Sequence, residues 1–180
     1  MTALLVVVVL VVLQRLCELV LSQRNTRRLR ARGAIECGAA HYPLLVALHT
    51  AWLAALIVFV PWDTPPDWLL LGVFLLFQLG RVWVIASLGP FWTTRIITLP
   101  GAPLVRRGPY RWMRHPNYAI VAGEIAVLPL AFGAWTLAGV FSLLNAALLW
   151  HRIRIENAAL AERRRPDQSR VSGVSSRRGA

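Results

Sequence analysis

Apolar residues are gathered into long blocks that short polar connections separate. The blocks occupy residues 4–21, 43–60, 68–88, 117–132 and 134–150. As helices, they are long enough, or nearly long enough, to cross a hydrocarbon layer of about 30 Å. The pattern therefore predicts an all-α integral membrane protein with about five transmembrane helices and not a soluble core.

The connections differ in length and polarity. Residues 22–42 are expected to form a loop or a short surface helix, and residues 89–115 form a long polar connection. Gly133 joins the last two blocks closely enough to predict an antiparallel helical hairpin at the C-terminal side. The last helix meets no breaker before Pro166, so we expect it to continue past the membrane through Glu156.

The chain is predicted to form a single membrane domain over residues 1–165. Residues 166–180 are rich in Ser, Gly and Arg, and this composition predicts a disordered basic tail.

The distribution of charged residues predicts how the helices are oriented in the membrane. The chain is 57% hydrophobic and carries a formal net charge of +12, all of it from arginine because there is no lysine. The arginines follow the first, third and fifth blocks, whereas residues 61–67 and the Gly133 turn have none. The positive-inside rule therefore predicts an outside N-terminus and a cytoplasmic C-terminus. Arginine beside apolar blocks also favours membrane lipid over nucleic acid as the partner.

Several charged residues lie inside the blocks, where charge is costly. Arg15 and Glu18 are three residues apart, so they share a helix face and can pair. With the predicted topology, they lie near the cytoplasmic side together with Arg81 and Glu124. They belong either to a structural ion pair or to the wall of a site. The cysteines and histidines of the chain show no metal-binding spacing, and no metal is expected.

The segment 108–118, GPYRWMRHPNY, is the most polar part of the chain between apolar blocks. Arginines next to aromatic rings suit an anionic, partly flat ligand, because guanidinium binds carboxylate and rings stack. We therefore predict a binding site at the membrane surface, with a soluble cofactor on the cytoplasmic face and a lipophilic substrate from the bilayer.

The same residues carry a family resemblance. Arg114-His115-Pro116-Asn117-Tyr118, preceded by Gly108-Pro109-Tyr110, resembles the R-H-P-x-Y signature of the isoprenylcysteine carboxyl methyltransferase family. The family's acidic cluster on the last helix is similar to Arg152-Ile153-Arg154-Ile155-Glu156-Asn157, although Asn157 replaces the second glutamate.

The front half resembles bacterial members associated with type III polyketide synthases, which methylate alkylpyrones or phenolic lipids. The similar segments are Arg24-Asn25, Gly33-Ala34-Ile35-Glu36, His41-Tyr42-Pro43 and Trp92-Thr93-Thr94-Arg95. This resemblance implies O-methylation of such a lipid, with carboxyl methylation of an isoprenylcysteine-like substrate as the alternative.

The resemblance implies S-adenosylmethionine as cofactor. The positions expected to line its pocket are Gly108, Tyr110, Arg114, His115, Tyr118 and Glu156. Methyl transfer requires alignment and a deprotonated acceptor. Arg81, Arg95 or Arg111 would keep the acceptor ionised, and His115 is the candidate base.

Other interpretations remain open for these residues. Arg106, Arg107 and Arg111 could serve only to bind lipid headgroups, and Arg152 could pair with Glu156 on the helix surface. An NADPH-dependent membrane reductase on a related scaffold and a non-catalytic membrane adaptor are the alternative functions.

Overall fold

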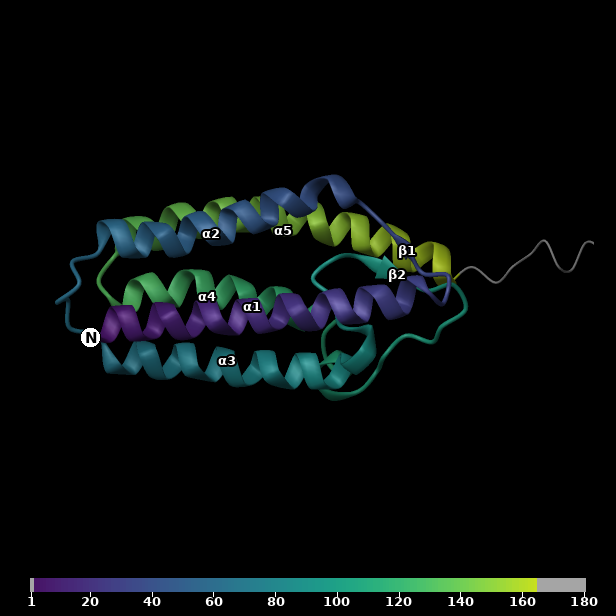
Figure 1. Cartoon of the computed structure of the whole chain (residues 1–180), viewed down its shortest axis with the longest axis horizontal. Helices are drawn as coiled ribbons and strands as arrows, with labels where there is room; N and C mark the ends of the chain where they lie inside the picture. Colours follow the sequence, from purple (N-terminus) through teal and green to yellow (C-terminus); the bar gives the residue numbers. More distant parts are fainter. Residues whose placement is uncertain (1, 165–180) are drawn as a thin grey trace, which may run out of the picture.

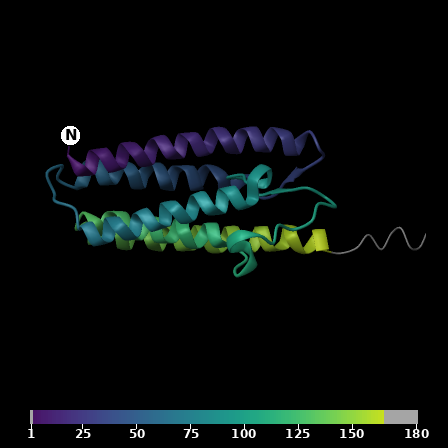
Figure 2. The same ribbon diagram turned by 90° about the horizontal axis from the view of Figure 1, so that it is seen from below.

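Five long helices make up most of the protein in a computed structural model that describes residues 2–164. They lie side by side with roughly parallel axes, as two views at right angles show (Figures 1 and 2). The helices are α1 (Ala3–Arg30), α2 (Tyr42–Phe59), α3 (Trp68–Leu88), α4 (Pro116–Ala131) and α5 (Trp135–Arg164). The short elements are β1 (Ile35–Glu36), β2 (Ile97–Thr98) and the 3-10 helices η1 (Ala39–His41), η2 (Gly89–Phe91) and η3 (Gly108–Arg111).

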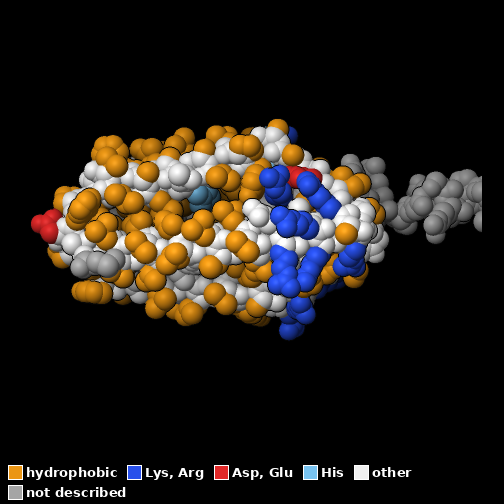
Figure 3. All heavy atoms as spheres, viewed as in Figure 1, with side chains coloured by type: hydrophobic (Ala, Val, Ile, Leu, Met, Phe, Trp, Pro, Cys, Tyr) orange, Lys and Arg blue, Asp and Glu red, His pale blue; other side chains and the backbone are white. Residues whose placement is uncertain are grey.

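Membrane-spanning length is reached in four segments of the described chain, by length and composition: Ala3–Arg30, Ala39–Phe59, Trp68–Phe91 and Trp135–Ala161. Pro116–Ala131 is a shorter apolar helix. The outer faces expose large apolar side chains, such as Leu69 at 78% and Leu143 at 75%, and apolar side chains are spread along most of the length of the face seen in Figure 3. Such faces suit hydrocarbon and not water. The predicted all-α integral membrane protein is confirmed.

The helix boundaries follow local sequence signals. The Asp67 carboxylate caps α3 by accepting from the backbone N–H groups of Leu69 at 2.9 Å and Leu70 at 3.1 Å. Pro116 begins α4, where its missing N–H costs nothing. Gly133 adopts a φ of +68° and turns the chain from α4 into α5. This turn produces the expected antiparallel hairpin.

The first helix is longer than the sequence pattern suggested. Residues 22–30, expected to lie in a loop or a separate surface helix, continue α1 without interruption to Arg30. They contain good helix formers and no glycine or proline, and Asn25 is buried at 3% exposure against the connection after α3. The last helix passes Glu156 as expected, whereas the predicted tail at 166–180 lies outside the described residues.

The two basic connections pair with each other. Ile35 lies opposite Thr98, and Glu36 lies opposite Ile97, in an antiparallel two-stranded ladder. The connection over 89–115 is therefore partly ordered by pairing with the chain after α1. The paired segments lie at one end of the bundle, away from the N-terminus (Figure 1).

The apolar core is built from all five helices. Val8 of α1, Leu56 of α2, Phe74 of α3, Leu128 of α4 and Phe141 of α5 belong to one buried cluster. This cluster packs the five helices against one another. The polar cavity described below lies at the end of the bundle where β1 and β2 pair.

Candidate functional site at the arginine-rich end

A large cavity lies at the end of the bundle where α4 begins and α5 extends beyond the apolar region. Its volume is about 1470 Å³, and segments 91–99 and 103–106, η3, α4 and α5 supply its walls. Arginine side chains gather on the visible surface of this end in Figure 3. The polar lining includes Thr93, Arg95, Tyr110, Arg111, Arg114, His115, Asn117, Tyr118, Arg152, Glu156 and Asn157.

Three side chains of α4 and α5 form a polar chain in the cavity wall. The Tyr118 hydroxyl donates to the Glu156 carboxylate and accepts from Arg152 Nε at 2.9 Å. Tyr118 lies on the first turn of α4, and the other two lie one turn apart on α5. Arg152 is only 5% exposed, and its Nη1 has no hydrogen-bond partner among the described residues. One buried guanidinium nitrogen of this cavity-lining residue is thus left without a protein partner.

His115 is held in a fixed orientation at the entrance of α4. Its ring stacks on Tyr118 with centroids 5.4 Å apart, and Nε2 lies 3.1 Å from the Asn157 side-chain oxygen. Because that oxygen only accepts, Nε2 donates. Nδ1 lies 3.7 Å from the Glu156 carboxylate. Asn157, the departure from the family pattern, therefore positions the histidine.

Tyr110, Arg111 and Arg114 line the cavity from η3 and the segment that follows it. Burial and the negative charge of Glu156 raise the pKa of Tyr110 above its usual value. The phenol thus stays neutral and able to donate a hydrogen bond. The arginines bring positive charge to the same wall.

Gly108 has a structural position. It does not line the cavity, and its φ is +57°. A Cβ atom there would lie 2.0 Å from the Ser87 hydroxyl oxygen, so the segment packs directly against α3. Glycine is needed for this approach.

Arg81 is neutralised inside the bundle. It is 4% exposed, and its guanidinium lies 2.9 Å from Glu124 and 3.4 Å from Glu18. Arg15 joins the same cluster at 2.8 Å from each carboxylate. The expected convergence of these residues is present, but they form a closed ion network between α1, α3 and α4. Arg81 meets the cavity only through Asn117, which accepts from it at 3.3 Å.

Arg95 lies in the cavity wall with its charge partly compensated. It binds Glu36 at 2.6 Å, and its guanidinium stacks over the Tyr42 ring at 4.1 Å from the centroid. The structure thus brings Arg95, Arg111, Arg114, His115, Tyr110, Tyr118 and Glu156 to one cavity, and it places Arg81 and Gly108 behind the wall.

Sequence reasoning did not include Arg152 among the residues of the site, and it kept a pairing with Glu156 on the helix surface as an open alternative. The structure instead buries Arg152 against Tyr118 and the Thr94 carbonyl oxygen, to which Nη2 donates at 2.5 Å. The four-residue spacing from Glu156 was a usable signal, because a site residue and its neighbour one turn away share a face. The contact with Thr94 depends on a long loop and had no local signal.

A polar cavity at one end of an apolar helical bundle defines a membrane protein that brings a polar ligand to the membrane surface. Residues 69–162 match the model of the isoprenylcysteine carboxyl methyltransferase (ICMT) family. The chain belongs to this family, and membership identifies it as a membrane methyltransferase. This assignment favours methyl transfer over the reductase and adaptor alternatives.

Two bacterial relatives extend the similarity to nearly the whole chain. The uncharacterized protein YpbQ of Bacillus subtilis (strain 168) is 40% identical over 159 residues, covering 86% of this chain and 95% of its own. An uncharacterized protein of Haemophilus influenzae is 29% identical over 154 residues, covering 82% and 88%. No solved structure matches the chain.

Proposed function

We propose that the protein is an S-adenosylmethionine-dependent O-methyltransferase that acts on a lipophilic acceptor such as an alkylpyrone or a phenolic lipid. The observation that carries this proposal is the cavity wall formed by Tyr118, Arg152 and Glu156. It brings a carboxylate and a phenol to one space, beside a buried guanidinium whose Nη1 has no protein partner among the described residues. We further propose that this end of the bundle faces the cytoplasm, because the arginines gather there.

The donor set fits the methyl donor, whose amino-acid part carries both a carboxylate and an ammonium group. Arg114 and the unpartnered Nη1 of Arg152 would hold the carboxylate. Glu156 would accept from the ammonium group or from ribose hydroxyls, and the Tyr110 and Tyr118 rings would flank the ligand. When bound, the cofactor supplies an electrophilic sulfonium methyl group.

The chain's own residues would prepare the acceptor. Arg95 and Arg111 place positive charge in the same cavity wall, which lowers the cost of an ionised acceptor oxygen. An enolic or phenolic hydroxyl then needs only a weak base. His115 is the candidate, because its ring lines the cavity and Asn157 engages Nε2 and not Nδ1.

The test uses purified protein in phosphatidylcholine nanodiscs, with binding of labelled S-adenosylmethionine and of NADPH measured separately. Methyl transfer is then followed to an alkylpyrone, a phenolic lipid and a prenylcysteine analogue. We expect cofactor binding, transfer to a hydroxyl, and loss of binding by at least tenfold in Glu156→Gln. Asp63→Asn, an exposed change in the connection before α3, is the matched control.

Transfer only to the prenylcysteine carboxylate would replace the proposed acceptor with the alternative one. Absence of cofactor binding, or unchanged binding in Glu156→Gln, would overturn the proposed site.

A further inference from the structure

A second, smaller cavity lies between α1 and α2 at the arginine-rich end. Its volume is about 460 Å³. The walls come from the last turns of α1, the first turns of α2 and the connection after α3. The residues that matter here are Thr26, Arg27, Arg30, Tyr42, Thr94 and Arg95. Neither the family match nor the proposed methyl-donor site assigns it a role.

The electrostatics of this cavity favour an anion. Three guanidinium groups, those of Arg27, Arg30 and Arg95, line it. One carboxylate, Glu36, compensates two of them by pairing with Arg30 and Arg95. Arg27 has no ion-pair partner among the side chains that the structure describes. The cavity therefore has excess positive charge.

A buried hydroxyl in the wall lacks a partner. Thr26 is only 8% exposed, and its Oγ1 has no hydrogen-bond partner among the described residues. A buried donor without a partner is unfavourable, so a ligand oxygen at this position would be favourable. Thr26 precedes Arg27 directly, which places hydroxyl and guanidinium on the same turn of α1.

The depth of the cavity identifies the source of the anion. The apolar part of α1, residues 3–20, spans ~27 Å at about 1.5 Å per residue, which is close to the hydrocarbon thickness. Residues 22–30 then lie at the level of lipid headgroups. Leu19 and Val46 form the apolar side of the cavity between two membrane-spanning helices. Acyl chains can follow these helices, whereas the phosphate meets the arginines.

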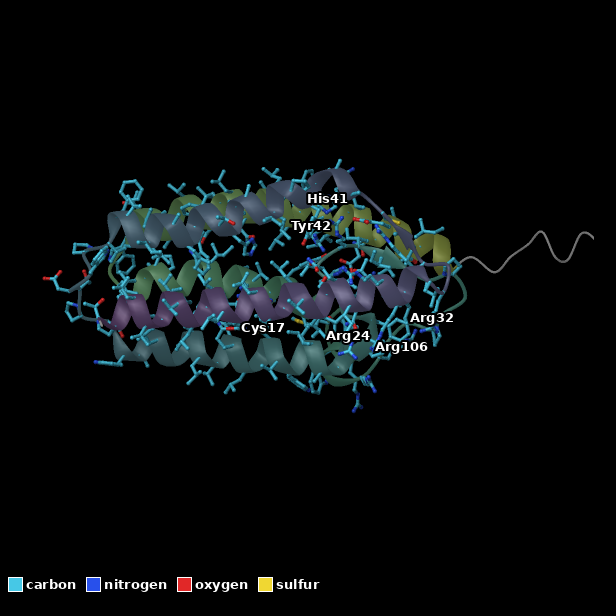
Figure 4. The ribbon with its side chains drawn as sticks, in the orientation of Figure 1. Cys17, Arg24, Arg32, His41, Tyr42 and Arg106 are labelled. Carbon is cyan, nitrogen blue, oxygen red and sulfur yellow. The ribbon has the colours of Figure 1, made fainter. Side chains whose placement is uncertain are left out.

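We infer that this cavity binds the phosphate group of an anionic membrane lipid. Arg27 and Thr26 bind the phosphate oxygens, and Arg95 with Arg30 closes the site from the other side. Figure 4 shows Tyr42 at this end of the molecule, together with Arg24, Arg32 and Arg106.

The lipid site and the large cavity share a wall. Arg95 lines both cavities, and Thr94, directly before it, lines the smaller one. The Thr94 hydroxyl contacts Ser22 at 2.8 Å and Tyr42 at 3.2 Å, while its carbonyl oxygen accepts from Arg152. A bound headgroup would thus hold the segment that orients Arg152. We expect this ordering to raise the affinity for the methyl donor. That effect rests on the proposed function, whereas lipid binding does not.

The experiment measures retained lipid by native mass spectrometry after reconstitution with phosphatidylcholine alone or with added phosphatidylglycerol. Arg27→Gln and Thr26→Val are compared with Arg28→Gln, which removes the same charge from the next, non-lining position of α1. We expect one retained phosphatidylglycerol in the wild type and an affinity about tenfold lower in Arg27→Gln. Arg28→Gln should match the wild type. Equal melting temperatures in phosphatidylcholine confirm that the variants fold.

Equal loss in Arg27→Gln and Arg28→Gln would overturn the site, because only general surface charge would then be involved. A second arm adds inorganic phosphate to protein in neutral detergent. Stabilisation by phosphate without retention of phosphatidylglycerol would assign a free anion and overturn the lipid assignment. Lipid retention without methyl-donor binding would support this inference while contradicting the proposed function.

Discussion

Single residues in this protein take their roles from burial more than from charge. Arg152 and Arg154 are two positions apart on α5, yet Arg152 is 5% exposed and Arg154 is exposed. Arg152 bonds Tyr118 and Thr94, whereas Arg154 stacks over the Trp150 ring at 4.9 Å. The two arginines therefore form a natural pair of test and control.

We expect Arg152→Met to weaken binding of labelled S-adenosylmethionine by at least tenfold, because the buried N–H groups that hold Tyr118 and face the ligand are lost. Arg154→Met should bind like the wild type. The measurement is equilibrium binding in nanodiscs, with circular dichroism to verify helix content. Equal effects of the two changes would show that only net charge matters.

The helices of this bundle are held together by close packing in the apolar core and by ion pairs between side chains near the large cavity. Glu124 of α4 accepts from Arg81 of α3 and from Arg15 of α1, so one carboxylate joins three helices. Removing one partner of such a buried pair typically costs about 3–5 kcal/mol. Next to Glu124 on α4, Gly123 lies against the Phe77 ring of α3.

Gly123→Ala is expected to lower the melting temperature in detergent, because the added Cβ would lie 2.2 Å from Phe77 Cζ. Overpacking of this kind costs about 1–3 kcal/mol. Gly72→Ala in α3 and Gly139→Ala in α5 have open space and serve as controls. They should leave stability unchanged or raise it slightly, since alanine favours helix. A melting temperature for Gly123→Ala equal to that of the controls would contradict the close packing of α3 and α4.

The whole molecule is polarised along its length. On the face seen in Figure 3, apolar side chains are spread along most of the length, and arginines gather at the end that carries both cavities. This asymmetry supports an orientation in which a soluble cofactor reaches its site from the cytoplasm while an acceptor arrives through the bilayer.

Reporter fusions test this orientation in bacterial cells. A green fluorescent protein fused after residue 180 should fluoresce, because it folds in the cytoplasm, and alkaline phosphatase at the same position should be inactive. Fusions in the connection over residues 61–67 should give the opposite pattern. Phosphatase activity at the C-terminal position would reverse the proposed topology.

The sequence by itself determined the helices, their apolar outer faces and most of the candidate site. The lengths of the apolar blocks and the boundary signals at Pro116 and Gly133 are local features of the sequence. The helices could therefore be predicted without knowledge of the fold. The prediction of a loop or a short surface helix for residues 22–30 was wrong, because these residues were judged by their charge. Their burial against the chain after α3 favours a continuous α1 helix. The tertiary structure alone decided which arginines are available to a ligand. Arg81 is closed off by two carboxylates from other helices, and Arg152 is buried by a distant loop; contacts between segments so far apart leave no local pattern in the chain.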